Sequence, residues 1–202
     1  MRFAIITLTA LSSFGLLALS TPTIESSALP TALESETFAI DPVHSSAIFK
    51  IKHLDTSYFY GRFADMSGTL DFDSTDPSKC SLLIEIPAES MDSGNDKLDQ
   101  HLRSPDFFDA KQFPVVGFKS TKVEAGEDGG YRVTGDFMLH GVTKSITVDV
   151  EHVGSADGRR GKMVGFHTTF TIDRTEYDMN YGVGGPLGSE VELTISIEAG
   201  KI

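Results

Sequence analysis

Three neighbouring residues, Asp41, His44 and Ser45, are of the types that hydrolases combine for nucleophilic catalysis. A serine nucleophile needs a histidine close enough to accept its proton. Adjacent residues of a strand point to opposite faces, so a strand beginning at His44 would separate His44 from Ser45, whereas a turn there would leave catalysis open. The sequence has no Gly-x-Ser-x-Gly elbow, no His-Glu-x-x-His motif and no glycine-rich phosphate loop. We therefore do not predict an enzyme.

A second polar group, Asp99, His101 and Asp106, could approach a divalent cation. Residues two apart on a helix lie on different faces, so Asp99 and His101 are poorly placed to share one ion. Arg103 can pair with Asp99 or Asp106 instead. We predict no metal and no cofactor for this chain.

The composition is that of a globular protein with an acidic surface. The 202 residues are 40% apolar, enough for one core, and carry a net charge of −12. This charge repels nucleic-acid phosphates, so nucleic acid is not an expected partner. Cys80 is the single cysteine, which excludes a disulfide within the chain. It shares a strand face with Leu82 and Ile84, so we interpret it as a buried apolar residue rather than a reactive thiol.

The first residues are typical of a secretory signal peptide. Arg2 precedes an apolar run over residues 3–19, and small residues that suit cleavage follow as far as Ala28. We predict a signal peptide over 1–28, a linker over 29–36 and one folded domain over 37–202, located in the periplasm or secreted. An uncleaved membrane anchor is the alternative, because the apolar run approaches the length of a membrane span.

Apolar and polar residues alternate from Phe38 onward, with turn signals between the runs. About eight short strands, without the rhythm of alternating strands and helices, predict an all-β antiparallel barrel or sandwich. One segment, residues 98–108, breaks the alternation. Leu98 and Leu102 recur there at helical spacing, Asn95 or Asp96 can cap the helix, and Pro105 stops it.

Seven phenylalanines fall on the inward row of the predicted strands. A closed sheet of eight strands has room inside for side chains or for one small ligand. The residues alone leave both interpretations open: the rings fill the core, or they line a ligand cavity. The seven are Phe49, Phe63, Phe72, Phe118, Phe137, Phe166 and Phe170.

From Phe38 to Ala199 the chain resembles the YceI-like family of lipid or polyisoprenoid-binding proteins. The most diagnostic motif is the insert, Leu-Asp-Gln-His-Leu-Arg-Ser-Pro-Asp-Phe-Phe-Asp over residues 98–109. The opening Ile-Asp-Pro-Val-His-Ser over residues 40–45 and the hairpin over residues 135–144 also resemble the family. The chain departs from the family pattern after Arg174, where residues 177–186 replace a short aromatic-Gly-Met step.

This resemblance implies an extended, lipocalin-like, eight-stranded antiparallel β-barrel with one short helical insert. It also implies an apolar interior that holds a long isoprenoid or a similar amphiphile. The expected lipid-binding residues are the inward-facing rings and aliphatic side chains of the barrel and the insert: Phe49, Ile51, Phe63, Phe72, Leu102, Phe107, Phe108, Phe118, Phe137, Phe166 and Phe170. Polar residues beside the apolar runs are the candidates for head-group contacts: His53, His101, Lys144 and Arg174.

Our hypothesis is an exported carrier or scavenger of a polyisoprenoid or related lipid, for example under stress, with the insert capping one end of the barrel. The alternative is an interaction or structural barrel that uses an exposed sheet edge and has a collapsed, ligand-free core. Two further partners stay open, a membrane in transient contact and a second copy of the chain as a homodimer.

Overall fold

The computed structural model describes residues 35–159 and 161–202, and these are mostly β-structure. Their strands are β1 (Glu36–Ile40), β2 (Ser46–His53), β3 (Ser57–Phe63), β4 (Ser67–Phe72), β5 (Ser81–Pro87), β6 (Met91–Asp92), β7 (Val115–Ala125), β8 (Tyr131–Leu139), β9 (Val142–Gly158), β10 (Gly161–Asp173) and β11 (Leu187–Lys201). Helix α1 (Asp96–Leu102) is accompanied by short 3-10 helices, η1 (Pro77–Lys79), η2 (Ala88–Ser90), η3 (Glu127–Gly129) and η4 (Arg174–Tyr177).

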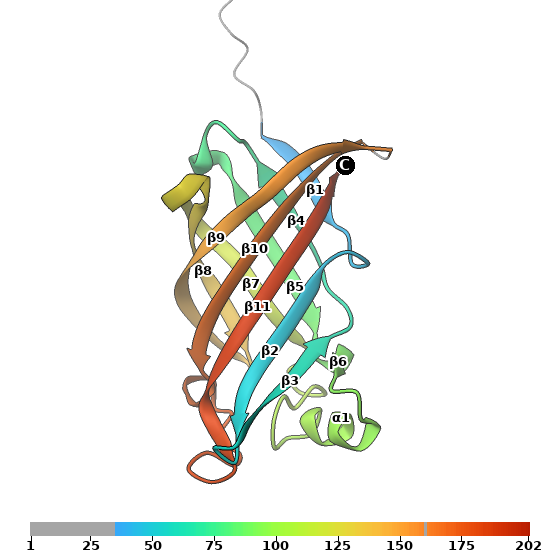
Figure 1. Cartoon of the computed structure of the whole chain (residues 1–202), viewed down its shortest axis with the longest axis vertical. Coiled ribbons are helices and arrows are strands. Elements are labelled where there is room, and N and C mark those ends of the chain that lie inside the picture. The colour runs from blue at the N-terminus through green and yellow to red at the C-terminus, as the bar shows by residue number, and fades with distance from the viewer. Residues whose placement is uncertain (1–34, 160) are drawn as a thin grey trace, which may run out of the picture. The chain divides into compact units, whose positions relative to one another are not determined.

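Eight strands close into a barrel in the order β1-β4-β5-β7-β8-β9-β10-β11, and the antiparallel pairing of β1 with β11 completes the ring. Figure 1 shows the long strands β9, β10 and β11 running obliquely along the barrel. The predicted eight-stranded antiparallel barrel with one short helix is confirmed, and the closed ring decides against a sandwich.

Three positions of the barrel wall are each occupied by two short strands in succession. Strand β1 pairs with the last residues of β11, whereas β2 pairs with β11 between Leu187 and Ser196, so β1 and β2 form one wall strand bent at residues 41–45. In the same way β4 pairs with β5 while β3 pairs with β6. Strands β3 and β4 therefore share the second wall position, and β5 and β6 share the third. The short strands β2, β3 and β6 therefore continue the wall toward one end of the barrel.

Strand β8 illustrates how the sequence pattern produces the wall. Val133, Phe137 and Leu139 are buried, whereas Arg132 before them and Asp136 between them are exposed. The strand ends in a tight hairpin at His140 and Gly141, which both have positive φ angles, 50° and 76°. Two such residues match the twist of antiparallel strands, so the predicted hairpin at this position is confirmed.

The insert lies beside β3 and β6 at one end of the barrel, which we call the insert end (Figure 1). The Asn95 side chain caps α1 by accepting hydrogen bonds from the backbone N–H groups of Lys97 and Leu98. Arg103 donates a hydrogen bond of 2.6 Å to the carbonyl of Met91, which ties the end of the helix to β6. The predicted helix, its cap and its end before Pro105 are confirmed.

The predicted signal peptide, residues 1–28, lies outside the described residues, and so does the predicted linker up to residue 34. Glu36, which the sequence assigned to the linker, is the first residue of β1. Within residues 35–159 and 161–202, no helix has both the length and the apolar character needed to span a bilayer.

Candidate functional site

The barrel encloses a cavity of about 630 Å³. Its lining extends from Tyr58 and Tyr181 at the insert end to Phe72 and Tyr131 at the opposite end, which we call the far end. The exposed side chains of Tyr58 and Tyr181 bring the cavity to the surface at the insert end. All eleven residues predicted to contact a lipid line this cavity, and their contact with a lipid stays a prediction.

Two of the lining phenylalanines lie against glycines of the neighbouring strand. Phe49 is paired with Gly61, and a Cβ atom added to Gly61 would overlap the Phe49 ring. The Phe118 ring covers Gly135 in the same way. Because each ring occupies the space that a side chain on the next strand would take, it lies along the wall. The interior is therefore lined with aromatic rings and still hollow.

The insert contributes side chains to the cavity as well as covering the barrel. The Phe108 ring meets the Phe63 ring edge-on at a centroid distance of 5.4 Å and the Phe49 ring at 6.3 Å. Leu102 and Phe107 are buried beside it. The prediction that the insert caps one end of the barrel agrees with these contacts.

Two predicted head-group residues, His53 and His101, line the cavity at the insert end. His101 is hydrogen-bonded through Nε2 to Asp106 at 2.9 Å. Its ring packs against Phe107 and Tyr181, with centroids 5.0 and 5.2 Å away, and these two rings also contact each other. The carboxylate and the two rings fix an imidazole at the cavity entrance, where it can meet a polar group of a ligand.

Arg174 also lines the cavity, but its donors are engaged by the protein itself. Nε, Nη1 and Nη2 donate to the carbonyls of Gly188, Met179 and Tyr181 at 2.9, 2.7 and 2.8 Å. The side chain is 3% exposed, and this burial lowers the pKa of the guanidinium. Arg174 therefore shapes the loop after η4.

Lys144 lies outside the cavity lining. Its ammonium donates to Glu176 at 3.0 Å and lies 5.7 Å from the centre of the Tyr177 ring. These contacts connect β9 to η4 on the outside of the barrel. A head-group contact at Lys144 would require the pair with Glu176 to open.

The far end is packed with aromatic rings and contains the single thiol. Phe72 and Phe166 meet edge to face at 5.3 Å, and Tyr131 lies 5.9 Å from Phe72. Cys80 lines the cavity there. Burial raises the pKa of the Cys80 thiol, against the smaller effect of its hydrogen bond to the Asp73 backbone. A raised pKa keeps the thiol protonated and slow to react at neutral pH.

Asp41, His44 and Ser45 lie away from the cavity lining, and His44 belongs to a turn. A turn is the arrangement that left a hydrolase open. The Ser45 hydroxyl, however, donates to the carbonyl of Glu198 at 3.2 Å and accepts from its N–H at 3.1 Å. Ser45 therefore ties the turn to β11. In the insert, the Asp99 carboxylate accepts a hydrogen bond from the Ser93 N–H, whereas His101 is hydrogen-bonded to Asp106. Asp99 and His101 therefore have different partners.

Sequence reasoning missed several lining residues. Phe59 alternates with Gly61 and Phe63 on one face of β3, and this pattern could have identified it. Tyr181 and Leu187 are in or beside a loop without periodicity, where no local pattern predicts an inward side chain.

Comparisons of this chain with known proteins, by sequence and by structure, point to one family. The family model of the YceI-like domain matches residues 38–199. A UPF0312 protein of Vibrio parahaemolyticus is 37% identical over 177 residues, which cover 86% of this chain and 92% of that protein. The crystal structure of the Campylobacter jejuni YceI protein matches with a TM-score of 0.64 at 32% identity, covering 76% of this chain and 90% of the other.

A more distant structure has the same fold. It is described as a polyisoprenoid binding domain from Saccharophagus degradans and matches with a TM-score of 0.65, covering 82% of this chain and 98% of its own. At 15% identity this likeness shows the fold alone. The family model and the Vibrio relative each match most of the chain, and the barrel, its insert and its motifs agree with these matches. This protein therefore belongs to the YceI-like domain family.

Proposed function

We propose that this protein binds a polyisoprenoid, or a lipid with a similarly long apolar chain, inside the barrel. The observation that carries the proposal is the cavity of about 630 Å³, whose lining is mostly apolar side chains. Small-molecule sites in proteins typically occupy about 300–1,000 Å³ and are mostly apolar. The binding described for the Saccharophagus degradans domain, which has the same fold, supports this class of ligand.

The energetics of burial favour a long chain over a short one. Each buried CH₂ contributes ~0.8 kcal/mol, so one five-carbon isoprene unit gains roughly 4 kcal/mol at most. Association costs ~4–15 kcal/mol in lost freedom of motion. A ligand therefore needs several units inside the barrel to bind usefully. Because apolar walls distinguish poorly between chains of similar width, we expect weak selectivity for chain length.

We place the polar end of the ligand at the insert end, beside His101 and His53. Asp106 and the adjacent rings of Phe107 and Tyr181 keep the His101 imidazole at the entrance. The apolar chain would then extend toward Phe72 and Tyr131. This orientation leaves the polar group in contact with water, so the ligand avoids the cost of burying it.

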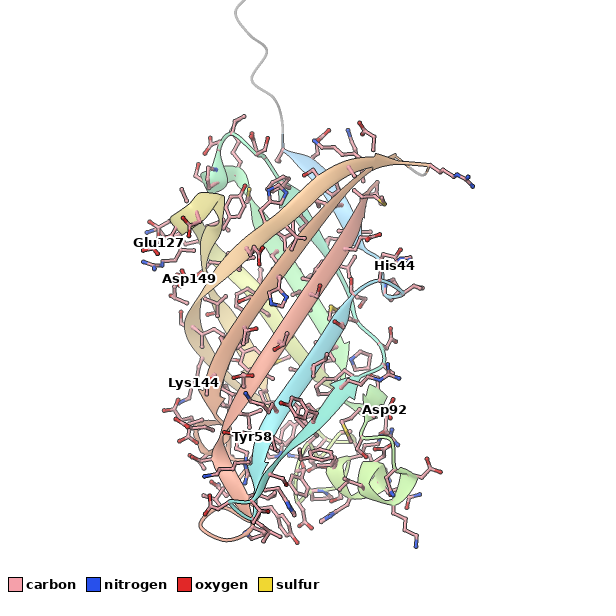
Figure 2. All side chains as sticks on the ribbon, in the orientation of Figure 1. His44, Tyr58, Asp92, Glu127, Lys144 and Asp149 are labelled. Carbon is pink, nitrogen blue, oxygen red and sulfur yellow. The ribbon has the colours of Figure 1, made fainter. Side chains whose placement is uncertain are left out.

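The outer face of β2 and β3 is the surface that we propose for transient contact with a membrane. Leu54, Tyr58 and Tyr60 are each more than half exposed, and the Lys50 ammonium lies 5.0 Å from the centre of the Tyr58 ring. Figure 2 shows Tyr58 near the insert end. Tyrosine and lysine together suit the interface between lipid head groups and water. Ser57 and Tyr58 also line the cavity, so this surface adjoins the entrance.

We further propose that the protein works in the periplasm or outside the cell after removal of residues 1–28, as a carrier or scavenger of lipid. The alternative of an interaction barrel without a ligand predicts a filled interior, and a cavity of this size counts against it. We propose binding as the primary activity, because His101 is paired with Asp106 and the donors of Arg174 are engaged by backbone carbonyls, so neither activates a nucleophile.

Native mass spectrometry of the purified mature protein, followed by lipid extraction, tests the proposed function. We expect a copurifying lipid, or uptake of a labelled isoprenoid by the delipidated protein. Absence of both would refute lipid binding.

Two variants at exposed and cavity positions control this experiment. Phe137→Lys introduces a charge into the cavity lining and should weaken retention, whereas Val153→Lys adds the same charge at an exposed position of β9 outside the lining and should not. Circular dichroism confirms that both variants are folded. Equal retention in the two folded variants would mean that the lipid binds elsewhere.

A further inference from the structure

Asp41, His44 and Glu198 form a cluster of metal-ligand side chains on the outside of the barrel. Asp41 and His44 come from the turn between β1 and β2, and Glu198 comes from β11 (Figure 2 labels His44 on this turn). His44 Nδ1 lies 3.0 Å from Asp41 Oδ2 and 3.8 Å from Glu198 Oε1. One ligand atom from each of the three residues lies within 4.8 Å of the others. None of them lines the lipid cavity.

Backbone and side-chain hydrogen bonds hold the two segments together. Asp41 N–H donates to the Glu198 carbonyl at 2.8 Å, and the Ser45 hydroxyl bonds both the carbonyl and the N–H of Glu198. The N–H of Val43 donates to Asp41 Oδ1 at 2.9 Å, which turns Oδ2 toward His44. The Asp41 carboxylate is thus held by a contact from outside the cluster, and Ser45 holds the Glu198 backbone in place. Such supporting contacts are typical of metal sites.

The charges of the cluster favour a cation. Within the described part of the chain, His44 is the one basic side chain within ion-pair distance of the Asp41 or Glu198 carboxylate. The cluster therefore gathers two carboxylates around one imidazole. A bound divalent ion would compensate both.

We propose that Asp41, His44 and Glu198 bind one divalent transition-metal ion of the zinc class. An imidazole nitrogen with two carboxylate oxygens suits zinc better than magnesium or calcium, which prefer oxygen ligands alone. Tetrahedral bonds of ~2.0–2.1 Å place ligand atoms about 3.3 Å apart, and the separations of 3.0 and 3.8 Å bracket that spacing. Because the His44 side chain is 61% exposed, water can complete the coordination.

The position of the site gives the ion a structural consequence. The pairing of β1 with β11 closes the barrel, and it ends at Ile40 and Ala199, directly beside Asp41 and Glu198. An ion bound by both strands would strengthen this closure. The site is separate from the cavity, so zinc binding and lipid binding can succeed or fail independently.

Isothermal titration of the chelator-treated protein with zinc chloride at neutral pH tests the proposal. We expect one ion per chain and a rise in melting temperature with zinc. His44→Ala and the conservative Glu198→Gln should each weaken zinc binding by about tenfold or more. His152→Ala removes a histidine outside the cluster and should leave zinc affinity unchanged. Lack of binding by the wild-type chain, or equal affinity in all four proteins, would overturn the proposal.

Discussion

The ring of Phe49 lies against Gly61 on the neighbouring strand, in the space that any larger side chain at position 61 would occupy. The ring of Phe118 on β7 lies against Gly135 on β8 in the same way. An aromatic ring that covers a glycine stabilises the sheet and stays close to the wall. The two glycines therefore help to determine how much empty space the barrel contains.

The first prediction is that Gly61→Ala reduces the capacity of the cavity. The added methyl group overlaps the Phe49 ring, which must rotate away from the wall and into the cavity. Displacing about two CH₂ groups of ligand costs ~1.6 kcal/mol, which corresponds to about tenfold in Kd. Titration of the variant with a fluorescent isoprenoid measures this loss.

Gly154→Ala is the matched control for this substitution. A Cβ atom at Gly154 meets no heavy atom within 4 Å, and the backbone there suits any residue. Isoprenoid affinity in this variant should equal that of the wild type. If Gly61→Ala binds as tightly as Gly154→Ala, the Phe49 ring does not limit the cavity.

The second prediction concerns Arg174, whose three hydrogen bonds to carbonyls organise the loop at the insert end. Arg174→Ala leaves these acceptors without their donor and should lower the free energy of unfolding by about 3 kcal/mol or more. Arg132→Ala, which removes an exposed pair with Asp149, should cost less than about 1 kcal/mol. Urea denaturation compares the two variants, and equal losses would contradict a structural role for Arg174.

The third prediction is a loss of stability in acid that depends on Asp73. A hydrogen bond from the Thr75 hydroxyl, followed by one from the Thr75 backbone, lowers the pKa of Asp73 to about 2 from an ordinary value of 3.8. Because the folded-state pKa is lowered, the contribution is complete above the ordinary pKa and is lost as the pH falls toward 2. Asp73→Asn should flatten the decline of stability between these values. Urea midpoints of the wild type and the variant, measured across this pH range, test the prediction. A parallel decline of the two midpoints would contradict it.

The fold could be predicted from sequence because each wall strand carries its own signal. Alternation in β8 and the positive-φ pair at His140 and Gly141 are local properties, and local properties are what a pattern reveals. The interruptions of the wall are different. The bend between β1 and β2 depends on which residues of β11 pair with each of these strands, and on the contact of Ser45 with Glu198. These partners lie far away in the sequence, so no local pattern reveals the bend.

The cavity could not be predicted because it depends on strand register. Inward phenylalanines were identifiable, but whether they fill or line the interior depends on which residue faces each ring across the sheet. Phe49 faces Gly61 only in the observed register. Arg174 gives the same lesson, since two of the carbonyls that engage its donors, those of Met179 and Tyr181, come from a loop without periodicity.

The fourth prediction uses Cys80 as a natural gauge of how far a ligand extends. The thiol lines the cavity at the far end, and its pKa is raised by burial, so alkylation by a small apolar maleimide should be slow at neutral pH and faster in alkaline solution. A ligand whose polar end stays beside His101 reaches Cys80 only if its chain spans the cavity. Labelling should therefore be slowed by saturating long isoprenoids and not by saturating short ones. Mass spectrometry follows the labelling. Equal protection by short and long chains, or protection by neither, would contradict a ligand that lies along the barrel with its polar end at the insert.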